Sequence, residues 1–429
     1  MLNILTSRWK YAIIFALINL ILGNSYSYSF IRPVIEKEFG INSALSGMPL
    51  IALLISFCVL MFFNSNIVAK FGNIKTFYIG LAVLAVGYIG SGFVNNIELL
   101  TLFFGVISGA GIGILYSSTL IATGLIFPDK KGLAMGITTS GFGLSPLFVT
   151  FVFSHLIANF GLSKMFLYLG SVSSVLILIL ITQIKIQQPQ SLKSKELEGL
   201  DTQQMLGNNL FWAIYLCFTI AMMSGLIVVG TTAPLAIEIL DMSKANTAFL
   251  VAFLALPNFF GRIFYGFLTS KFQLKTIGLI SFLLTALASA GIASGIVNNL
   301  PLFGLSMAII WSSFGGWLSL SPTAIAKFFG AKHYAKNYGL TFTGYGLGGL
   351  IGIFVTSYIQ TVHGNYATGY WIITALSSFG MIITLWLKSE QNAVQSKSQI
   401  IEDNQSEIQA ITKPSKFEGE FAFRVKWRL

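Results

Sequence analysis

The chain has 429 residues, of which 55% are hydrophobic and only 10% are charged, and its formal net charge is +11. Soluble domains carry about 25% charged residues, so this composition excludes an ordinary soluble protein. Together with a mean hydropathy of +0.77, it indicates a protein that crosses a membrane many times.

Twelve apolar runs, each long enough to cross a bilayer as a helix, follow one another along the chain. The first six are 11–31, 45–68, 76–94, 99–126, 133–159 and 165–184, and the second six are 209–237, 247–270, 276–297, 300–326, 338–361 and 368–387. We therefore expect an all-α membrane protein of two six-helix bundles, over residues 1–184 and 209–387. The polar segment 185–208 would form a cytoplasmic central loop, and the polar residues 388–429 a disordered cytoplasmic tail.

The lysine and arginine residues are divided unequally between the two sides of this arrangement. With both termini in the cytoplasm, 21 of the 26 lie in cytoplasmic segments, whereas the outer segments hold only Arg32, Lys37, Lys164 and Lys244. The positive-inside rule is therefore obeyed. The basic excess is then a signal of topology and of contact with anionic lipid, not a nucleic-acid-binding surface. We expect a multi-pass protein of the bacterial inner membrane with both termini in the cytoplasm.

The remaining basic residue, Arg262, lies deep within the predicted span 247–270. An arginine in such a position costs about 2.5–3.5 kcal/mol on insertion scales. No carboxylate falls within the predicted spans to pair with it, so we expect its partner to be a transported substrate, a small organic anion. The alternative is a side chain that snorkels to the cytoplasmic interface, since that end of the helix is only ~12 Å away.

Residues that bind metals or carry out catalysis are few. Cys58 and Cys217 lie in apolar runs and give neither a disulfide framework nor a metal-binding spacing. His155, His333 and His363 fall near the ends of the runs or between them. No Ser/His/Asp set, phosphate-binding loop or pair of carboxylates falls within a run. We therefore expect no cofactor, no metal site and no enzymatic activity.

Two short strings recur in the two halves of the chain. The connection after the second run, 69–76, resembles the connection after the eighth, 270–276, and the string at 141–144 in the fifth run resembles the string at 344–347 in the eleventh. Each pair lies about 200 residues apart at corresponding runs. Parallel repeats of this kind place a substrate site at the interface of the two halves, near the middle of the membrane.

Twelve spans, a long central loop and basic second and eighth connections resemble the major facilitator superfamily. That family's loop signature is Gly-x-x-x-Asp-Lys/Arg-x-Gly. The positions that match it are Ser65, Ala69, Lys70 and Gly72 in the first copy, and Gly266, Ser270, Lys271 and Gln273 in the second. The resemblance implies a gating role for Lys70, Gly72, Gly266 and Lys271. Both copies lack the acidic residue, which puts the role of that residue in doubt here.

Finer strings resemble the oxalate/formate antiporter and monocarboxylate porter group within that superfamily. They are spread over most of the predicted membrane domain: Tyr26-Ser-Tyr28, Gly113-Ile-Leu-Tyr116-Ser, Phe127-Pro-Asp-Lys-Lys-Gly132, Gly261-Arg262, Phe314-Gly-Gly316 and Asn337-Tyr-Gly339 with Thr343-Gly-Tyr345-Gly. In that group an arginine of span eight binds the substrate carboxylate, and Arg262 occupies the matching position.

Two departures from that group bear on the substrate. In the monocarboxylate porters an aspartate often lies one helical turn before the arginine, whereas here the position is Asn258, which can bond Arg262 but cannot carry a proton. Asn258 has an alternative role, which is to satisfy backbone groups freed by Pro257. Tyr345 stands where the oxalate antiporter has a second cation, a lysine. The resemblance thus implies one fixed positive charge, which suits a monoanion.

Aromatic residues are the other candidate substrate contacts, because a phenol can donate to a carboxylate and shape an apolar pocket. The candidates are Tyr26, Tyr28, Tyr116, Trp311, Phe342 and Tyr345. Anchoring at the membrane interface is an alternative role for the tyrosines near helix ends, and simple packing is the alternative for the rest.

We expect a monomeric secondary transporter that moves a small organic anion, and specifically a monocarboxylate, by alternating access and by exchange. One alternative is a proton-coupled symporter or an efflux porter of another small solute. A second is a membrane receptor or scaffold that does not transport.

Overall fold

The computed structural model describes residues 2–185, 199–363, 365–385 and 387. By internal contacts the chain divides into Met1–Leu387 and Lys388–Leu429, and the described residues all belong to the first unit. The predicted tail, 388–429, and most of the predicted central loop, 186–198, lie outside the described residues. The boundaries proposed for two separate bundles remain predictions.

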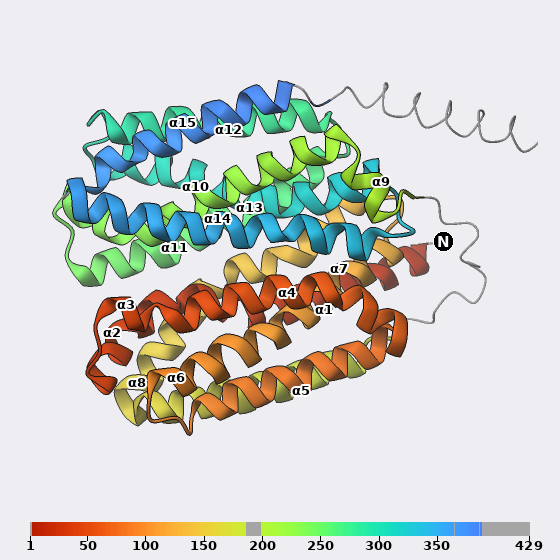
Figure 1. Cartoon of the computed structure of the whole chain (residues 1–429), viewed down its shortest axis with the longest axis horizontal. Helices are drawn as coiled ribbons and strands as arrows, with labels where there is room; N and C mark the ends of the chain where they lie inside the picture. The colour runs from red at the N-terminus through yellow and green to blue at the C-terminus, as the bar shows by residue number, and fades with distance from the viewer. Residues whose placement is uncertain (1, 186–198, 364, 386, 388–429) are drawn as a thin grey trace, which may run out of the picture. The chain divides into compact units, whose positions relative to one another are not determined.

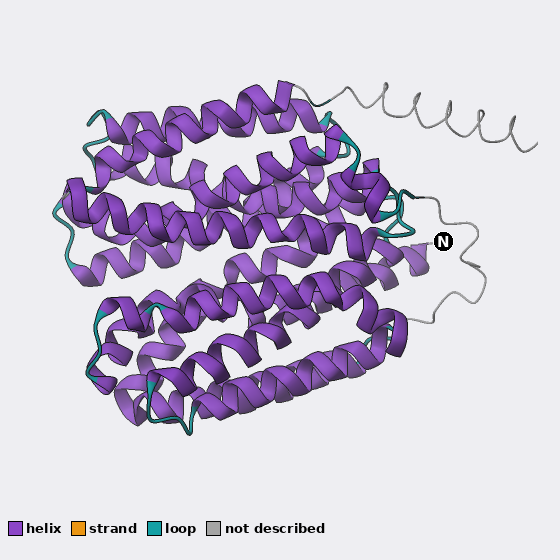
Figure 2. Ribbon diagram, viewed as in Figure 1, coloured by secondary structure: helices purple, strands orange, loops and turns teal. Residues whose placement is uncertain are grey.

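The named elements of the described residues are helices joined by short connections (Figure 2). The first group is α1 (Leu2–Leu22), η1 (Gly23–Ser27), α2 (Tyr28–Phe39), α3 (Ser43–Ser46), α4 (Met48–Phe71), α5 (Asn73–Ser91), α6 (Ile97–Leu100), η2 (Thr101–Ile107), α7 (Ser108–Ile126) and α8 (Lys131–Thr182). The second is α9 (Thr202–Leu206), α10 (Asn209–Leu240), α11 (Lys244–Leu268), α12 (Leu274–Ala293), α13 (Leu300–Phe328), α14 (Tyr334–His363) and α15 (Tyr366–Leu385).

Helix length and hydropathy match the twelve predicted runs. Nine helices of the described residues are long and apolar enough to span a membrane, and the bent pair Arg8–Ser27 and Phe30–Phe39 adds a tenth. Helix α8 has 52 residues and breaks at Gly161, where φ is 79°. Its length of ~78 Å exceeds twice the hydrocarbon core of a bilayer, so it supplies two spans. The shorter apolar helix Gly369–Leu385 falls on the last run.

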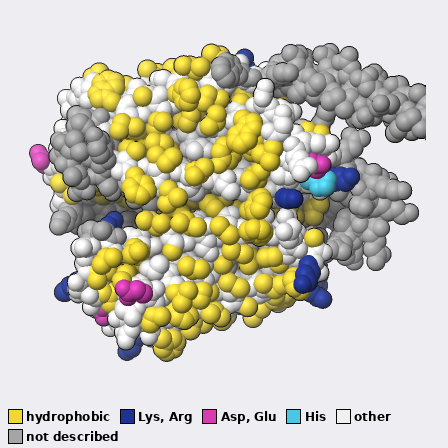
Figure 3. All heavy atoms as spheres, viewed as in Figure 1, with side chains coloured by type: hydrophobic (Ala, Val, Ile, Leu, Met, Phe, Trp, Pro, Cys, Tyr) yellow, Lys and Arg dark blue, Asp and Glu magenta, His cyan; other side chains and the backbone are white. Residues whose placement is uncertain are grey.

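The outward-facing side chains of this unit are suited to lipid. Large hydrophobic residues remain exposed, among them Phe93 at 75% and Phe354 at 71%. In the view of Figure 3, hydrophobic side chains cover the middle of the visible face, and lysine and arginine side chains gather toward its ends. A soluble monomer rarely exposes apolar surface on this scale, so the surface agrees with a bilayer as the surroundings.

Helices α1–α8 form one group and α10–α15 another, and the two groups meet most extensively through two helix pairs, α8 with α11 and α4 with α14 (Figure 1). We call these two contacts the seam. At the end that carries Lys70, Lys130 and Lys271, which we call the basic end, glycines allow the backbones to approach closely. A Cβ atom on Gly132 would lie 2.5 Å from the carbonyl oxygen of Gly266, and one on Gly339 would lie 2.8 Å from that of Met61.

The described end of the central segment is ordered against the second group of helices. Leu200 donates its N–H to the carbonyl of Phe329 at 2.9 Å. Asn337, which is fully buried, donates to the carbonyl of Leu200 at 3.0 Å and accepts from the hydroxyl of Thr202 at 2.9 Å. The short helix α9 follows, capped by Asp201. This part of the segment is therefore fixed to the connection between α13 and α14.

Candidate anion-binding site

Arg262 lies on α11 at the seam, and its side chain is fully buried. Its Nε donates to Oδ1 of Asn258, one helical turn earlier, at 3.0 Å. Its Nη1 donates to the main-chain carbonyl of Thr139 on α8 at 2.7 Å. The third nitrogen, Nη2, is buried and has no hydrogen-bond partner among the described residues. The side chain thus points into the seam and does not snorkel to the surface.

Neutral groups alone hold this charge among the described residues. Arg8 pairs with Asp129 and Arg32 pairs with Glu36, and both ion pairs lie away from Arg262. A buried cation without a carboxylate partner is expensive, because backbone and amide dipoles replace only part of its hydration. The site therefore keeps a net positive charge and one free donor.

Asn258 adds a second free donor beside the first. It is fully buried. Its Oδ1 accepts from Arg262, and its Nδ2 has no partner within the described ranges of the chain. Gly143 on α8 makes room for this arrangement. A Cβ atom there would overlap Oδ1 of Asn258 and lie 2.9 Å from Nε of Arg262. An acceptor that reached Nη2 and Nδ2 would satisfy both groups.

Aromatic side chains from both helix groups surround the guanidinium. The Cζ atom of Arg262 is 6.0 Å from the ring centroid of Phe142, within the range of a cation–π contact. The rings of Tyr26 and Tyr116 both meet that of Phe142 edge to face, with centroid distances of 5.0 Å and 5.5 Å. Tyr345, from α14, donates to the hydroxyl of Tyr26 at 3.2 Å. The charge is thus bordered by polar hydroxyls set among apolar rings.

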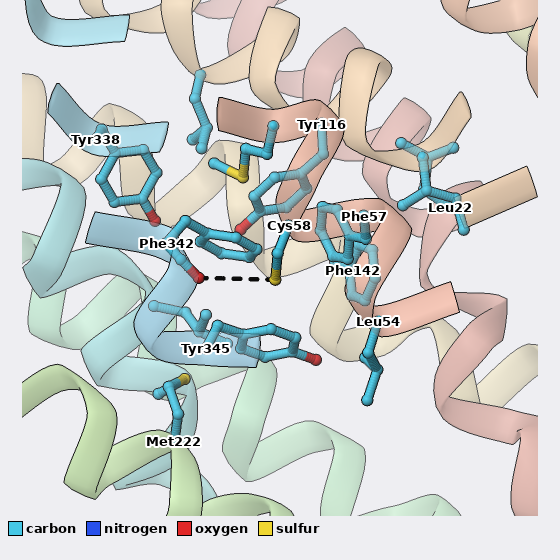
Figure 4. Packing of buried hydrophobic residues seen from close by; sticks show 14 of the residues in the cluster. Leu22, Leu54, Phe57, Cys58, Tyr116, Phe142, Met222, Tyr338, Phe342 and Tyr345 are labelled. Carbon is cyan, nitrogen blue, oxygen red and sulfur yellow. Dashed lines mark hydrogen bonds between the residues drawn. The ribbon is translucent and has the colours of Figure 1, made fainter. Parts of the chain in front are cut away.

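A second layer of rings joins these residues. Phe57 of α4 lies 5.5 Å from Tyr116, 6.1 Å from Phe142 and 5.1 Å from Phe342, centroid to centroid. Phe342 stacks on Tyr345 at 5.0 Å. Figure 4 shows these rings converging from different helices, with the thiol of Cys58 donating to the carbonyl of Phe342. The predicted residues Tyr26, Tyr116, Asn258, Phe342 and Tyr345 are therefore brought together around Arg262.

Two predicted residues lie elsewhere. The hydroxyl of Tyr28 donates to the carbonyl of Ser46 at 2.6 Å, and its ring stacks on Phe104 inside the first helix group. Trp311 donates its Nε1 to the hydroxyl of Thr232 at 3.3 Å and belongs to a separate apolar cluster with Met307. The structure does not bring either side chain to Arg262, because each is committed to packing within its own group.

The structure also brings residues to the site that the sequence did not single out: Phe57, Thr139, Phe142 and Gly143. Phe142 and Gly143 lie in the string at 141–144 that recurs at 344–347, so the repeat was the one available signal for them. Thr139 takes part through its carbonyl oxygen, for which side-chain identity gives no signal.

The four residues of the predicted loop motif divide into two kinds. Lys70 and Lys271 are exposed at the basic end, where each ammonium group lies over a neighbouring phenylalanine ring. Gly72 takes a φ of 81° between α4 and α5, a region that favours glycine. Gly266 is buried against Gly132 in the seam. Gly72 and Gly266 thus have backbone roles, and the lysines face outward.

The sequence of this chain matches a known protein family over most of its length. Two overlapping stretches of the chain, residues 13–352 and 232–427, match the Major Facilitator Superfamily. The chain belongs to the Major Facilitator Superfamily. It is therefore a multi-pass membrane transporter, and the family is one of transporters rather than enzymes.

Several curated relatives cover most of the chain. The oxalate:formate antiporter of Oxalobacter formigenes is 26% identical over 88% of this chain and 90% of its own. The MFS-type transporter YhjX of Escherichia coli, itself uncharacterized, is 25% identical over 81% of this chain and 87% of its own. Monocarboxylate transporter 13 of Bos taurus is 26% identical over 75% of this chain and 76% of its own. The predicted resemblance to this group is confirmed.

A solved structure shares the fold. The proton:xylose symporter XylE superposes with a TM-score of 0.70 at 12% identity, covering 89% of this chain and 96% of that one. The predicted fold class, an all-α membrane protein of the major facilitator type, is confirmed.

Proposed function

We propose that this transporter carries a small organic anion, and specifically a monocarboxylate, past Arg262 by alternating access. The observation that carries the proposal is the fully buried guanidinium with neutral partners only and a free Nη2. The relatives named as an oxalate:formate antiporter and a monocarboxylate transporter support a carboxylate as the cargo.

The number of charges in the site favours a monoanion. The described residues around the guanidinium contribute tyrosine hydroxyls, an amide and phenyl rings, and no second cation. A dianion would therefore bring one more negative charge than the site can neutralise, and burying that charge would be costly. Formate, lactate and pyruvate each carry a single carboxylate, which Nη2 of Arg262 and Nδ2 of Asn258 can receive together.

Exchange follows from the same charge. Once an anion is bound, the pair is neutral and the occluded state becomes less costly. An empty carrier would have to rearrange the seam around an unpaired guanidinium, so reorientation without substrate is slow. The basic excess on one side of the predicted topology supports placement in the bacterial inner membrane with both termini in the cytoplasm.

The test is counterflow in proteoliposomes loaded with unlabelled formate, lactate or pyruvate. Arg262→Ala should abolish uptake of the labelled anion. Arg262→Lys should reduce it at least tenfold, because a lysine cannot reproduce the planar fork that contacts both Asn258 and Thr139. Arg32→Ala is the control, since it removes a guanidinium paired with Glu36 outside the seam, and it should transport normally.

Full uptake by both Arg262 variants would contradict the proposed role. Exchange-independent uptake driven by a pH gradient in the wild-type protein would favour the proton-coupled alternative. Binding without any uptake would favour a receptor.

A further inference from the structure

Helix α14 presents a row of four aromatic side chains to the first helix group. Tyr334, Tyr338, Phe342 and Tyr345 are spaced by four, four and three positions, which places them on one face of a helix. Their rings follow one another in contact: Tyr334 and Tyr338 stack at 5.8 Å, Tyr338 meets Phe342 at 6.0 Å, and Phe342 stacks on Tyr345 at 5.0 Å. Figure 4 shows the last three of these rings in sequence along the helix.

One end of this row, Tyr345, lies beside Arg262, and the other end, Tyr334, lies farther along the seam. Tyr345 is bonded to Tyr26 beside the guanidinium. Tyr334 is the first residue of α14, at the basic end. The two residues are eleven positions apart, or ~16 Å along the helix. The row therefore extends from the site along the seam toward the end that the glycine contacts close.

The hydroxyls of Tyr334 and Tyr338 are buried and unpaired among the described residues. Both residues are buried, at 6% and 2% exposure, and neither hydroxyl has a hydrogen-bond partner in the part of the chain that the structure describes. Buried polar groups are almost always paired in native proteins, so two unpaired hydroxyls in successive turns require an explanation. The hydroxyl of Tyr345 in the same row donates a hydrogen bond to Tyr26, which shows that a tyrosine hydroxyl at this seam can be hydrogen-bonded.

The surroundings of Tyr338 connect it to the site. Tyr116 of α7 contacts the same ring, Phe342, from the opposite helix group at 5.8 Å, and Figure 4 shows the hydroxyls of both tyrosines pointing toward Phe342. Tyr334 faces Gly124 of α7, where a Cβ atom would lie 3.8 Å from its ring.

We propose that Tyr338 and Tyr334 form a second carboxylate subsite, which receives the anion from Arg262 as the seam opens at the basic end. This inference rests on the proposed function. A phenol donates one hydrogen bond without a full charge, so it holds a carboxylate more weakly than a guanidinium does. A pathway of weaker sites lets an anion leave a strong one without being trapped. The two hydroxyls thus lower the barrier to release.

The test separates rate from affinity. Tyr338→Phe, Tyr334→Phe and the double variant keep the rings and remove only the hydroxyls. We expect the maximal exchange rate for labelled formate, lactate and pyruvate to fall at least fivefold, and further in the double variant. The ligand concentration that half-saturates a thermal shift of the purified protein should stay within twofold of wild type, because Arg262 is intact.

Tyr370→Phe is the matched control. It removes a hydroxyl from an equally buried tyrosine on α15 that is bonded to Thr231, so it should leave the exchange rate unchanged. Wild-type exchange in the double variant would overturn the inference, as would an equal loss of affinity and rate. A loss confined to uptake driven by a pH gradient would also overturn it, because the hydroxyls would then relay protons.

Arg262→Ala, measured in the same experiment, distinguishes failure of the proposed function from failure of the second subsite. If it transports normally, the proposed function itself fails. If transport depends on Arg262 and the tyrosine variants behave as wild type, only the second subsite fails.

Discussion

At the scale of single residues, Gly143 determines whether the buried guanidinium can be held as it is. The amide of Asn258 and Nε of Arg262 occupy the space that a side chain at position 143 would need. Because Nε donates to that same amide at 3.0 Å, displacing one group displaces the other. The absence of a side chain on α8 thus orients a hydrogen-bonded pair on α11.

Gly143→Ala is therefore expected to weaken binding of a monocarboxylate about tenfold or more, equivalent to about 1.4 kcal/mol, while the protein still folds. The half-saturating concentration in a thermal-shift titration measures this. Gly304→Ala is the control, since nothing lies within 4 Å of its added Cβ. It should bind normally and be stabilised by up to about 1 kcal/mol through helix propensity. Equal affinities for the two variants would contradict the assignment.

Residue type and depth were enough to single out Arg262 as a candidate, because a charge in the middle of an apolar run is conspicuous, and the structure shows that its side chain is buried. The direction in which each tyrosine side chain points was harder to predict. Tyr26 and Tyr28 are two positions apart, and the chain passes from η1 into α2 between them, so one phenol faces the site and the other faces Ser46. The carbonyl of Thr139 could not be predicted at all, since every residue has one.

At the scale of helices, the crossing of α8 and α11 controls closure at the basic end. A Cβ atom on Gly266 would overlap the carbonyl oxygen of Gly132. A Cβ atom on Gly132 would overlap both the carbonyl oxygen of Gly266 and the hydroxyl of Thr269. These atoms are mostly backbone, which cannot turn aside as a flexible side chain can. Closure of this end therefore requires glycine at both positions.

Gly132→Ala should push α8 and α11 apart at the basic end and shift the carrier toward states open there. The expected result is exchange at least fivefold slower, with a longer distance between spin labels placed at the start of α8 and the end of α11. Gly230→Ala, whose added Cβ would lie 3.9 Å from Thr356, should change neither quantity. An unchanged label distance in Gly132→Ala would show that this crossing does not limit closure.

Most helices were predictable from hydropathy because lipid demands about 20 apolar residues per span. Their interruptions were not. The bend of 52° within the first span lies at the polar stretch 23–29, which contains Gly, Asn and Ser and which the predicted run 11–31 crosses without interruption. The π-helical turn η2 lies inside an apolar run that carries no such signal. Helix α9 follows a capping box, Asp201 with Gln204, which a search for apolar runs does not detect.

At the scale of the whole transporter, one charge and one seam account for the proposed cycle. The guanidinium is held by groups from both helix groups, Asn258 on α11 and Thr139 on α8. Any movement that opens the seam must therefore disturb its hydrogen bonds. A bound carboxylate would replace the hydrogen bonds that Arg262 loses. Binding of the anion is thereby coupled to opening of the seam.

The repeat in the sequence could predict that the site lies between two halves, because parallel repeats share an interface. It could not predict which helices form the seam, since α8–α11 and α4–α14 are paired only by the folded backbone. The side of the membrane that each end faces remains a prediction from the distribution of lysine and arginine.

The most direct test of the central claim is equilibrium binding of formate, lactate and pyruvate to the purified protein. Binding is measured as the rise in the temperature of thermal unfolding, Tm. A ligand present at one hundred times its Kd stabilises the folded state by about 2.7 kcal/mol. The account predicts a saturable rise in Tm for the wild-type protein and for Arg32→Ala, and no rise for Arg262→Ala. An undiminished rise in Arg262→Ala would contradict it.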